Sequence, residues 1–179
     1  MKVLFPRLIK WVALVEQKLQ KRLADEIRTV IKAKGGVTLF ALNKMVLTKL
    51  VVYEYLRINP PVPFQYSEPK VDFVVQSHDA TFEIKKGKML FGFNRLQIKI
   101  PREDRDKLLK YVHWSNERET EDSTTENKAC ARKDSVVLLC RVLLVDLFLH
   151  FETFEVEAGT IMFAPSVMFK TLAKASSIT

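Results

Sequence analysis

Apolar residues recur at steps of three and four along the first part of the chain, with Lys, Arg and Glu between them. This spacing places one apolar stripe along the surface of a helix. It predicts a single long amphipathic helix that ends at Gly35-Gly36, with a stripe made of Leu8, Val12, Val15, Leu19, Leu23, Ile27 and Ile31. A second helical run covers residues 40–57 and stops at Pro60-Pro61, because proline cannot continue a helix.

After the prolines the apolar residues fall at every second position, which is typical of strands. We expect three short strands in a small antiparallel meander, with turns at residues 76–79 and 85–88. The Met and Phe side chains of these strands are expected in the core. The alternating residues are Val71, Phe73, Val75, Phe82, Ile84, Met89, Phe91 and Phe93.

The rest of the chain separates into polar loops and two apolar segments. Residues 97–107 and 115–128 are charged or polar without a clear period and are predicted as loops. Residues 135–151 predict a buried helix, because Arg141 and Asp146 interrupt a run that would otherwise suit a membrane span. Residues 154–169 alternate around Gly159 and Pro165, which indicates a final hairpin. The pattern therefore predicts an α+β fold that is mainly helical, with a small antiparallel sheet.

Composition narrows the class of protein. A chain of 179 residues with 47% apolar and 28% charged residues suits one globular domain of ordinary size. The net charge of +8 comes from Lys and Arg spread along the chain, without the dense basic block that favours nucleic acid. A basic surface can still attract anionic lipid or a fatty-acid carboxylate. Two cysteines indicate neither a disulfide framework nor a zinc site, which favours an intracellular protein.

The most informative residue is Cys130, which comes just before the apolar segment 136–151. The unpaired N–H groups and positive dipole end at the start of a helix favour an anionic sulfur. Such a sulfur can bind a soft metal or a haem iron. From the residues alone, a buried or idle thiol stays open as the alternative. Cys140 lies inside the same segment and is expected in the core.

Upstream, Glu54 and Arg57 are three positions apart and share a helix face, either as a solvated pair or as a structural one. The three histidines fall in predicted loops or at a helix end, and we assign them no acid–base role. They are His78, His113 and His150.

These motifs occur in an order that resembles the C-terminal part of a cytochrome P450. The similar segments are Glu54-x-x-Arg57, residues 60–66, 76–80 and 111–116, and Asn127-Lys128-Ala129-Cys130. They are most similar to the plant subfamily that rearranges fatty-acid hydroperoxides, which comprises allene oxide synthase, hydroperoxide lyase and divinyl ether synthase. The resemblance implies that residues 1–179 form a single partial domain, the haem-binding C-terminal portion of a haem-thiolate fold.

The resemblance also implies roles for individual residues. Cys130 is expected to be the axial thiolate ligand of the iron of haem b, and Lys128 the cation that pairs with a haem propionate. Asn127 belongs to the same loop, and Glu54 and Arg57 are expected to form a buried ion pair that braces the core. No catalytic residue is identified in the chain.

For the activity, the resemblance implies an allene oxide synthase-like enzyme of oxylipin synthesis, with hydroperoxide lyase or divinyl ether synthase as alternatives. The substrate would be a fatty-acid hydroperoxide, which brings its own O–O bond, so no reductase is needed. Localisation in the chloroplast is expected, although no transit peptide is recognised in the chain. The basic surface would allow peripheral membrane association, and no nucleic-acid partner is expected.

Several positions depart from the family pattern. Arg132 stands where the family has glycine, two residues after the cysteine, and is expected to shift the loop or weaken the haem pocket. The segment between Phe93 and Lys107 is short and lacks the third partner of the ion pair, for which Arg102 or Arg105 could substitute. The chain starts with residues similar to those just after the family's distal asparagine. A truncated, inactive fragment without the distal half of the site is therefore a further alternative.

Overall fold

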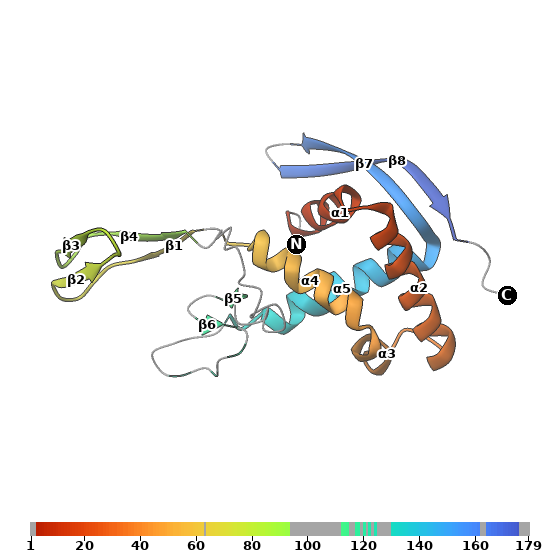
Figure 1. The fold of residues 1–179 in the computed structure, drawn as a ribbon, viewed down its shortest axis with the longest axis horizontal. Helices are drawn as coiled ribbons and strands as arrows, with labels where there is room; N and C mark the ends of the chain where they lie inside the picture. Colours follow the sequence, from red (N-terminus) through yellow and green to blue (C-terminus); the bar gives the residue numbers. More distant parts are fainter. Residues whose placement is uncertain are drawn as a thin grey trace.

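A computed structural model describes residues 3–62, 64–93, 112–114, 117–118, 120, 122, 124, 130–161 and 164–175. Figure 1 shows a helical body with a long hairpin over one side and a narrow β-arm that extends away from it. The helices are α1 (Leu4–Leu14), α2 (Gln17–Lys34), α3 (Leu39–Lys44), α4 (Val46–Ile58) and α5 (Lys133–His150). The hairpin consists of β7 (Phe151–Ile161) and β8 (Ala164–Lys174). The arm consists of β1 (Phe64–Ser67), β2 (Phe73–Gln76), β3 (Thr81–Ile84) and β4 (Leu90–Phe93), and the short strands β5 (His113–Trp114) and β6 (Glu117–Arg118) pair separately.

The first predicted helix is in fact two, and the prediction of one continuous helix is wrong. The chain turns at Val15, whose backbone is extended with φ −79° and ψ 161°. The side chain of Gln20 lies at the break, where its Nε2 donates to the carbonyl oxygen of Val12 at 3.4 Å. A carbonyl at the end of α1 is therefore bonded by a side chain of α2. The end of α2 agrees with the prediction, since Gly35 has φ 72° and takes the left-handed conformation that favours glycine.

The second predicted helix is also divided, at Met45, into α3 and α4. Thr38 begins α3, where its Oγ1 accepts the N–H of Ala41 at 3.1 Å. Glu26 of α2 fulfils a similar role for α4. Its carboxylate accepts the N–H groups of Leu47 at 2.7 Å and Thr48 at 2.8 Å, and the Thr48 hydroxyl at 2.8 Å. Because these N–H groups bond to a distant carboxylate, a new helix starts where the apolar pattern predicted an uninterrupted one.

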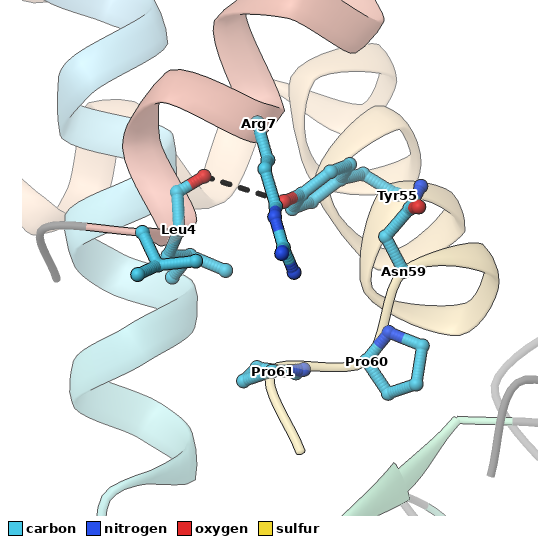
Figure 2. A pocket seen from close by; sticks show the side chains of 7 residues that line it. Leu4, Arg7, Tyr55, Asn59, Pro60 and Pro61 are labelled. Carbon is cyan, nitrogen blue, oxygen red and sulfur yellow. Dashed lines mark hydrogen bonds between the residues drawn. The ribbon is translucent and has the colours of Figure 1, made fainter. Parts of the chain in front are cut away.

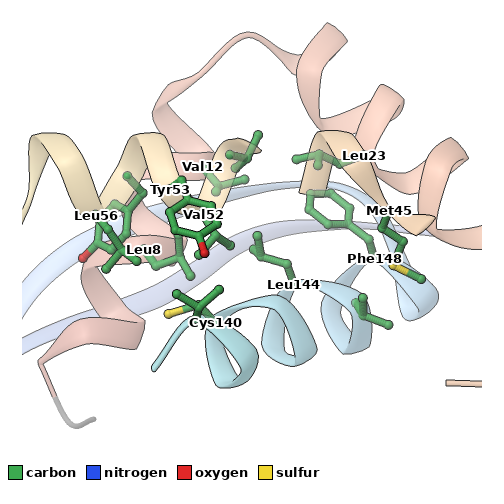
Figure 3. Close-up of a cluster of buried hydrophobic side chains, with 14 of the residues drawn as sticks. Leu8, Val12, Leu23, Met45, Val52, Tyr53, Leu56, Cys140, Leu144 and Phe148 are labelled. Carbon is green, nitrogen blue, oxygen red and sulfur yellow. The ribbon is translucent and has the colours of Figure 1, made fainter. Parts of the chain in front are cut away.

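The core lies where α1, α2, α4 and α5 meet, and Figure 3 shows their apolar side chains interdigitated. Leu8, Val12, Leu23, Val52, Leu144 and Phe148 are among its fully buried members. Two polar side chains also lie inside. Gln20 links α1 and α2 to β7, since it bonds both the N–H and the carbonyl of Phe154 at 2.9 and 3.3 Å. Arg141 of α5 donates to the carbonyl of Leu42, and its burial lowers the pKa of the guanidinium.

The strands of the arm differ from the predicted meander. β2 pairs with β3 as expected, but β4 pairs with β1, in the register Phe64↔Phe93 to Ser67↔Leu90. The predicted turn at residues 76–79 forms, with Ser77 N–H bonded to Ala80 O at 2.7 Å. At the second turn Gly87 has φ 78° and donates to Pro69 O at 3.1 Å, which directs β4 toward β1. The expected burial of the Met and Phe side chains is wrong, because Phe82, Met89 and Phe91 are each more than half exposed.

The C-terminal elements follow the prediction closely. α5 begins two residues before the predicted start and ends one residue before the predicted end. The hairpin forms and is longer than predicted, with register shifts between Phe151 and Thr153 and between Glu155 and Val156. Figure 1 shows it lying beside α1 and α2. Together these elements form an α+β fold, as predicted. The predicted loop at residues 97–107 lies outside the described residues, as does most of the loop at 115–128.

Candidate functional site

Cys130 lies three residues before the first residue of α5. Its carbonyl accepts the N–H of Lys133 at 3.0 Å, so the cysteine belongs to the turn that leads into the helix. The thiol is free and half-buried, and its side chain packs against the edge of the apolar core. The residues that precede it, Asn127 and Lys128, lie outside the described part of the chain. The structure therefore describes the expected iron ligand and its helix, and leaves the two other cofactor residues as predictions.

Arg132, which replaces the family's glycine, directly precedes α5. Its backbone has φ −108° and ψ 8°, which any residue can adopt, and its side chain is exposed. Its carbonyl accepts the N–H of Val136 at 2.9 Å and so starts the hydrogen-bond ladder of α5. The local backbone thus accommodates arginine without strain. The expected effect of Arg132 on a haem pocket stays a prediction.

The structure brings Glu54 and Arg57 together on one face of α4. Nε and one terminal nitrogen of Arg57 each donate to a different oxygen of Glu54, both at 2.7 Å. The Arg57 side chain is 11% exposed and that of Glu54 is 31% exposed. The hydrogen bond that Arg57 donates to Glu54 raises the pKa of Arg57, against the opposing effect of burial. The pair is more exposed than the buried pair we expected, and its proposed third partners, Arg102 and Arg105, lie outside the described residues.

The remaining cysteine and two of the histidines are not part of the candidate site at Cys130. Cys140 is fully buried, and burial raises the pKa of its thiol to about 12, so it is a core residue as predicted. His78 is exposed in the turn after β2, and His150 is the last residue of α5. In the described part of the chain, no three His, Cys, Asp or Glu side chains gather as a metal-binding group. Likewise, none of the described helices has the length and apolarity needed to cross a membrane.

A pocket between the start of α1 and the end of α4 was not predicted. Its volume is about 140 Å³, and it is lined by Val3, Leu4, Arg7, Tyr55, Asn59, Pro60 and Pro61. The hydroxyl of Tyr55 donates to the carbonyl of Leu4 at 3.2 Å and ties the two helices together (Figure 2). Tyr55 follows the Glu54 of the ion pair in sequence, but it lines this pocket, and Glu54 does not. Only the packing of two segments 51 residues apart creates this pocket.

The arrangement of helices, arm and hairpin is a cytochrome P450 fold. A solved structure described as a crystal structure of a cytochrome P450 superposes with a TM-score of 0.60 over 97% of this chain and 42% of that chain, at 14% identity. The cytochrome P450 family model matches residues 14–92. The chain belongs to this family, whose members hold a haem iron through a cysteine thiolate.

The similar curated proteins come from one group of plant enzymes. The chain is 49% identical to a 9-divinyl ether synthase of Capsicum annuum, over 97% of this chain and 39% of that protein. It is 47% identical to an allene oxide synthase of Parthenium argentatum, over 98% of this chain and 40% of that protein. The chain therefore spans about two fifths of the length of these relatives.

The residues at Cys130 fit a haem iron in donor chemistry. A half-buried, free thiol at the entrance to an 18-residue helix can supply one soft anionic ligand from an apolar surface. A single protein ligand of this type is what the iron of a cytochrome P450 requires. The fit extends only to the described side of the site, which is the side of Cys130 and α5.

Proposed function

We propose that this chain provides the thiolate-bearing part of a haem enzyme that rearranges fatty-acid hydroperoxides. The observation that carries the proposal is the 44–49% identity to allene oxide synthases and divinyl ether synthases across nearly the whole chain, together with the position of Cys130 at the start of α5. In this proposal residues 1–179 are a single partial domain, and the cofactor is haem b. We assign no residue of this chain to the distal side of the haem, where the substrate would react.

Cys130 would bind the iron through its sulfur, and α5 would fix the position of Cys130. The exposed N–H groups at the start of α5 and the helix dipole stabilise negative charge on the sulfur. The apolar core behind the cysteine keeps water from one side of it. Lys128 would pair with a propionate and Asn127 would complete the loop. When bound, a haem iron held by the thiolate of Cys130 would supply the capacity to cleave an O–O bond.

Glu54 and Arg57 would act through structure and not through contact with substrate. Their paired hydrogen bonds lie on α4, which packs against α5, the helix that follows Cys130. The ion pair therefore helps to stabilise α4 and, through it, the position of α5. We regard the two as positioning residues.

The activity that we favour is that of an allene oxide synthase, acting on a fatty-acid hydroperoxide without a reductase in oxylipin synthesis. Divinyl ether synthase is supported equally well by identity, at 49% against 47%, and hydroperoxide lyase remains the third member of the group. Two of the similar allene oxide synthases, from tomato and Arabidopsis, are described as chloroplastic, which supports the chloroplast as the location. The net charge of +8 would allow association with anionic membranes.

Haem titration tests the proposal on the chain itself. Purified chain should take up haem and, after reduction and addition of carbon monoxide, show the red-shifted Soret band of thiolate ligation. Cys130→Ala should lose this band, whereas His78→Ala should keep it, because His78 is exposed in a distant turn. Absence of haem uptake by the wild-type chain, or an unchanged band in Cys130→Ala, would refute the proposed site. Haem uptake without turnover of a fatty-acid hydroperoxide would instead support the inactive-fragment alternative.

A further inference from the structure

The pocket between α1 and α4 combines apolar walls with one unpaired positive charge. Leu4, Pro60 and Pro61 contribute apolar surface, while Arg7 and Asn59 contribute polar groups. Figure 2 shows the Arg7 side chain extending from α1 past the ring of Tyr55 toward the prolines, whereas the side-chain amide of Asn59 points away from Arg7. The guanidinium and the apolar groups therefore border the same space.

Arg7 has no anionic partner among the residues that the structure describes. Arg7 interacts electrostatically with Tyr55, and burial raises the pKa of the Tyr55 phenol while the positive charge of Arg7 opposes the rise. Tyr55 therefore remains neutral near pH 7, and its proton is already donated to the carbonyl of Leu4. The side-chain amide of Asn59 is likewise without a hydrogen bond within the described residues. The guanidinium of Arg7 thus lines the pocket without an acceptor among the described residues.

From this arrangement we infer that the pocket binds the carboxylate of a small apolar monocarboxylic acid, with Arg7 as the donor. A guanidinium can bond both oxygens of a carboxylate, which gives a geometric preference for this anion. The volume of about 140 Å³ is close to that of an engineered cavity of about 150 Å³ that holds benzene, so roughly six carbon-sized atoms would fit. A longer acid would extend beyond the pocket. The inference does not depend on haem or on the proposed activity.

Hexanoate is a suitable probe because its apolar tail of five carbons is of the size that the pocket volume allows, with the carboxylate at Arg7. Titration of the full chain, followed by amide shifts in a ¹⁵N–¹H spectrum, should show saturable changes at Tyr55, Asn59 and the first turn of α1. Arg7→Gln should weaken hexanoate binding about tenfold or more, in line with loss of a charge-assisted pair. Lys10→Gln is the matched control, because Lys10 is an exposed cation of the same helix that does not line the pocket. It should bind hexanoate as the wild type does.

Two further probes separate this inference from non-specific binding. Hexanol has the same chain without the charge and should bind at least tenfold more weakly than hexanoate. Inorganic phosphate has charge without an apolar chain and should produce no saturable change at these residues. Equal binding of hexanoate by wild type and Arg7→Gln, or of phosphate and hexanoate by the wild type, would overturn the inference. Because Arg7 is exposed, its substitution should leave the thermal midpoint within a few degrees of wild type, so that lost binding is not lost folding.

Discussion

Removal of either charge of the Glu54–Arg57 pair should destabilise the chain by an amount between the values for surface and buried pairs. An exposed ion pair contributes about 0–1 kcal/mol, and removal of one partner of a buried pair costs about 3–5 kcal/mol. Arg57 is almost covered at 11% exposure, whereas a third of Glu54 is exposed. We therefore expect Glu54→Leu and Arg57→Leu each to lower the free energy of unfolding by about 2 kcal/mol.

A double-mutant cycle separates the pair from the loss of each side chain. When both residues are leucine no charge is left unpaired, so the double variant should lose about as much stability as one single variant. The coupling energy should then be about 2 kcal/mol. Urea unfolding at pH 7 and 25 °C, followed by far-UV circular dichroism, measures all four proteins.

The ion pair between Glu157 and Lys170 of the hairpin provides a matched control cycle. Its atoms are 3.3 Å apart, but both side chains are 56% exposed. Water and salt screen such a pair, and its coupling energy should be at or below about 0.5 kcal/mol. If the coupling energy of Glu54 and Arg57 is no larger than that of the control pair, the reasoning from burial is wrong and the ion pair does not stabilise α4.

Three further predictions concern groups that hold the helices in place. Glu26→Gln should lower the free energy of unfolding, measured by urea unfolding, by about 1–2 kcal/mol, because the carboxylate at the start of α4 loses its charge. The control Asp25→Asn, on the exposed side of α2, should change this free energy by less than about 0.5 kcal/mol. Gln20→Met should cost about 2–4 kcal/mol in the same assay, because the buried N–H of Phe154 loses its acceptor, whereas Gln17→Met at the exposed start of α2 should be near neutral. The third prediction concerns Cys140, whose pKa is raised by burial in the folded state. The unfolded thiol ionises from about pH 9, while the folded thiol stays neutral to about pH 12. The stability of the wild type relative to Cys140→Ser should therefore be constant below pH 9 and fall above it, by at most about 1.4 kcal/mol per pH unit.

Each of these predictions has an outcome that contradicts it. Equal losses for Glu26→Gln and Asp25→Asn would mean that the charge at the start of α4 is unimportant. A neutral Gln20→Met would mean that water replaces the amide at Phe154. A constant stability difference between wild type and Cys140→Ser from pH 8 to 11 would mean that the thiol ionises equally in both states.

The sequence predicted those elements whose causes are local. The apolar run before His150 and the alternation around Gly159 predicted α5 and the hairpin, because helix period and strand period are properties of neighbouring residues. The left-handed Gly35 at the end of α2 is local for the same reason. The position of Cys130 before a helix likewise followed from the order of residues alone.

Features that depend on distant partners were not predictable. At the breaks at Val15 and Met45, Gln20 and Glu26 bond backbone groups that a continuous helix would use itself. The apolar spacing is the same on both sides of each break, so it carries no sign of them. In the arm, alternation predicted that strands form but not that β4 pairs with β1. The pocket at Arg7 depends on how α1 meets α4, which no local pattern encodes.

The bonds from Gln20 to Phe154 also bear on how the chain matures during its synthesis. These two residues are 134 positions apart. At a translation rate of about 5–20 residues per second, the ribosome needs roughly 7 to 27 seconds to reach Phe154 after it has added Gln20. Throughout that interval the Gln20 amide lacks its partner, and the apolar stripe of α1 lacks the hairpin that lies beside it. We therefore expect the nascent chain to depend most on a holding chaperone until β7 and β8 have emerged.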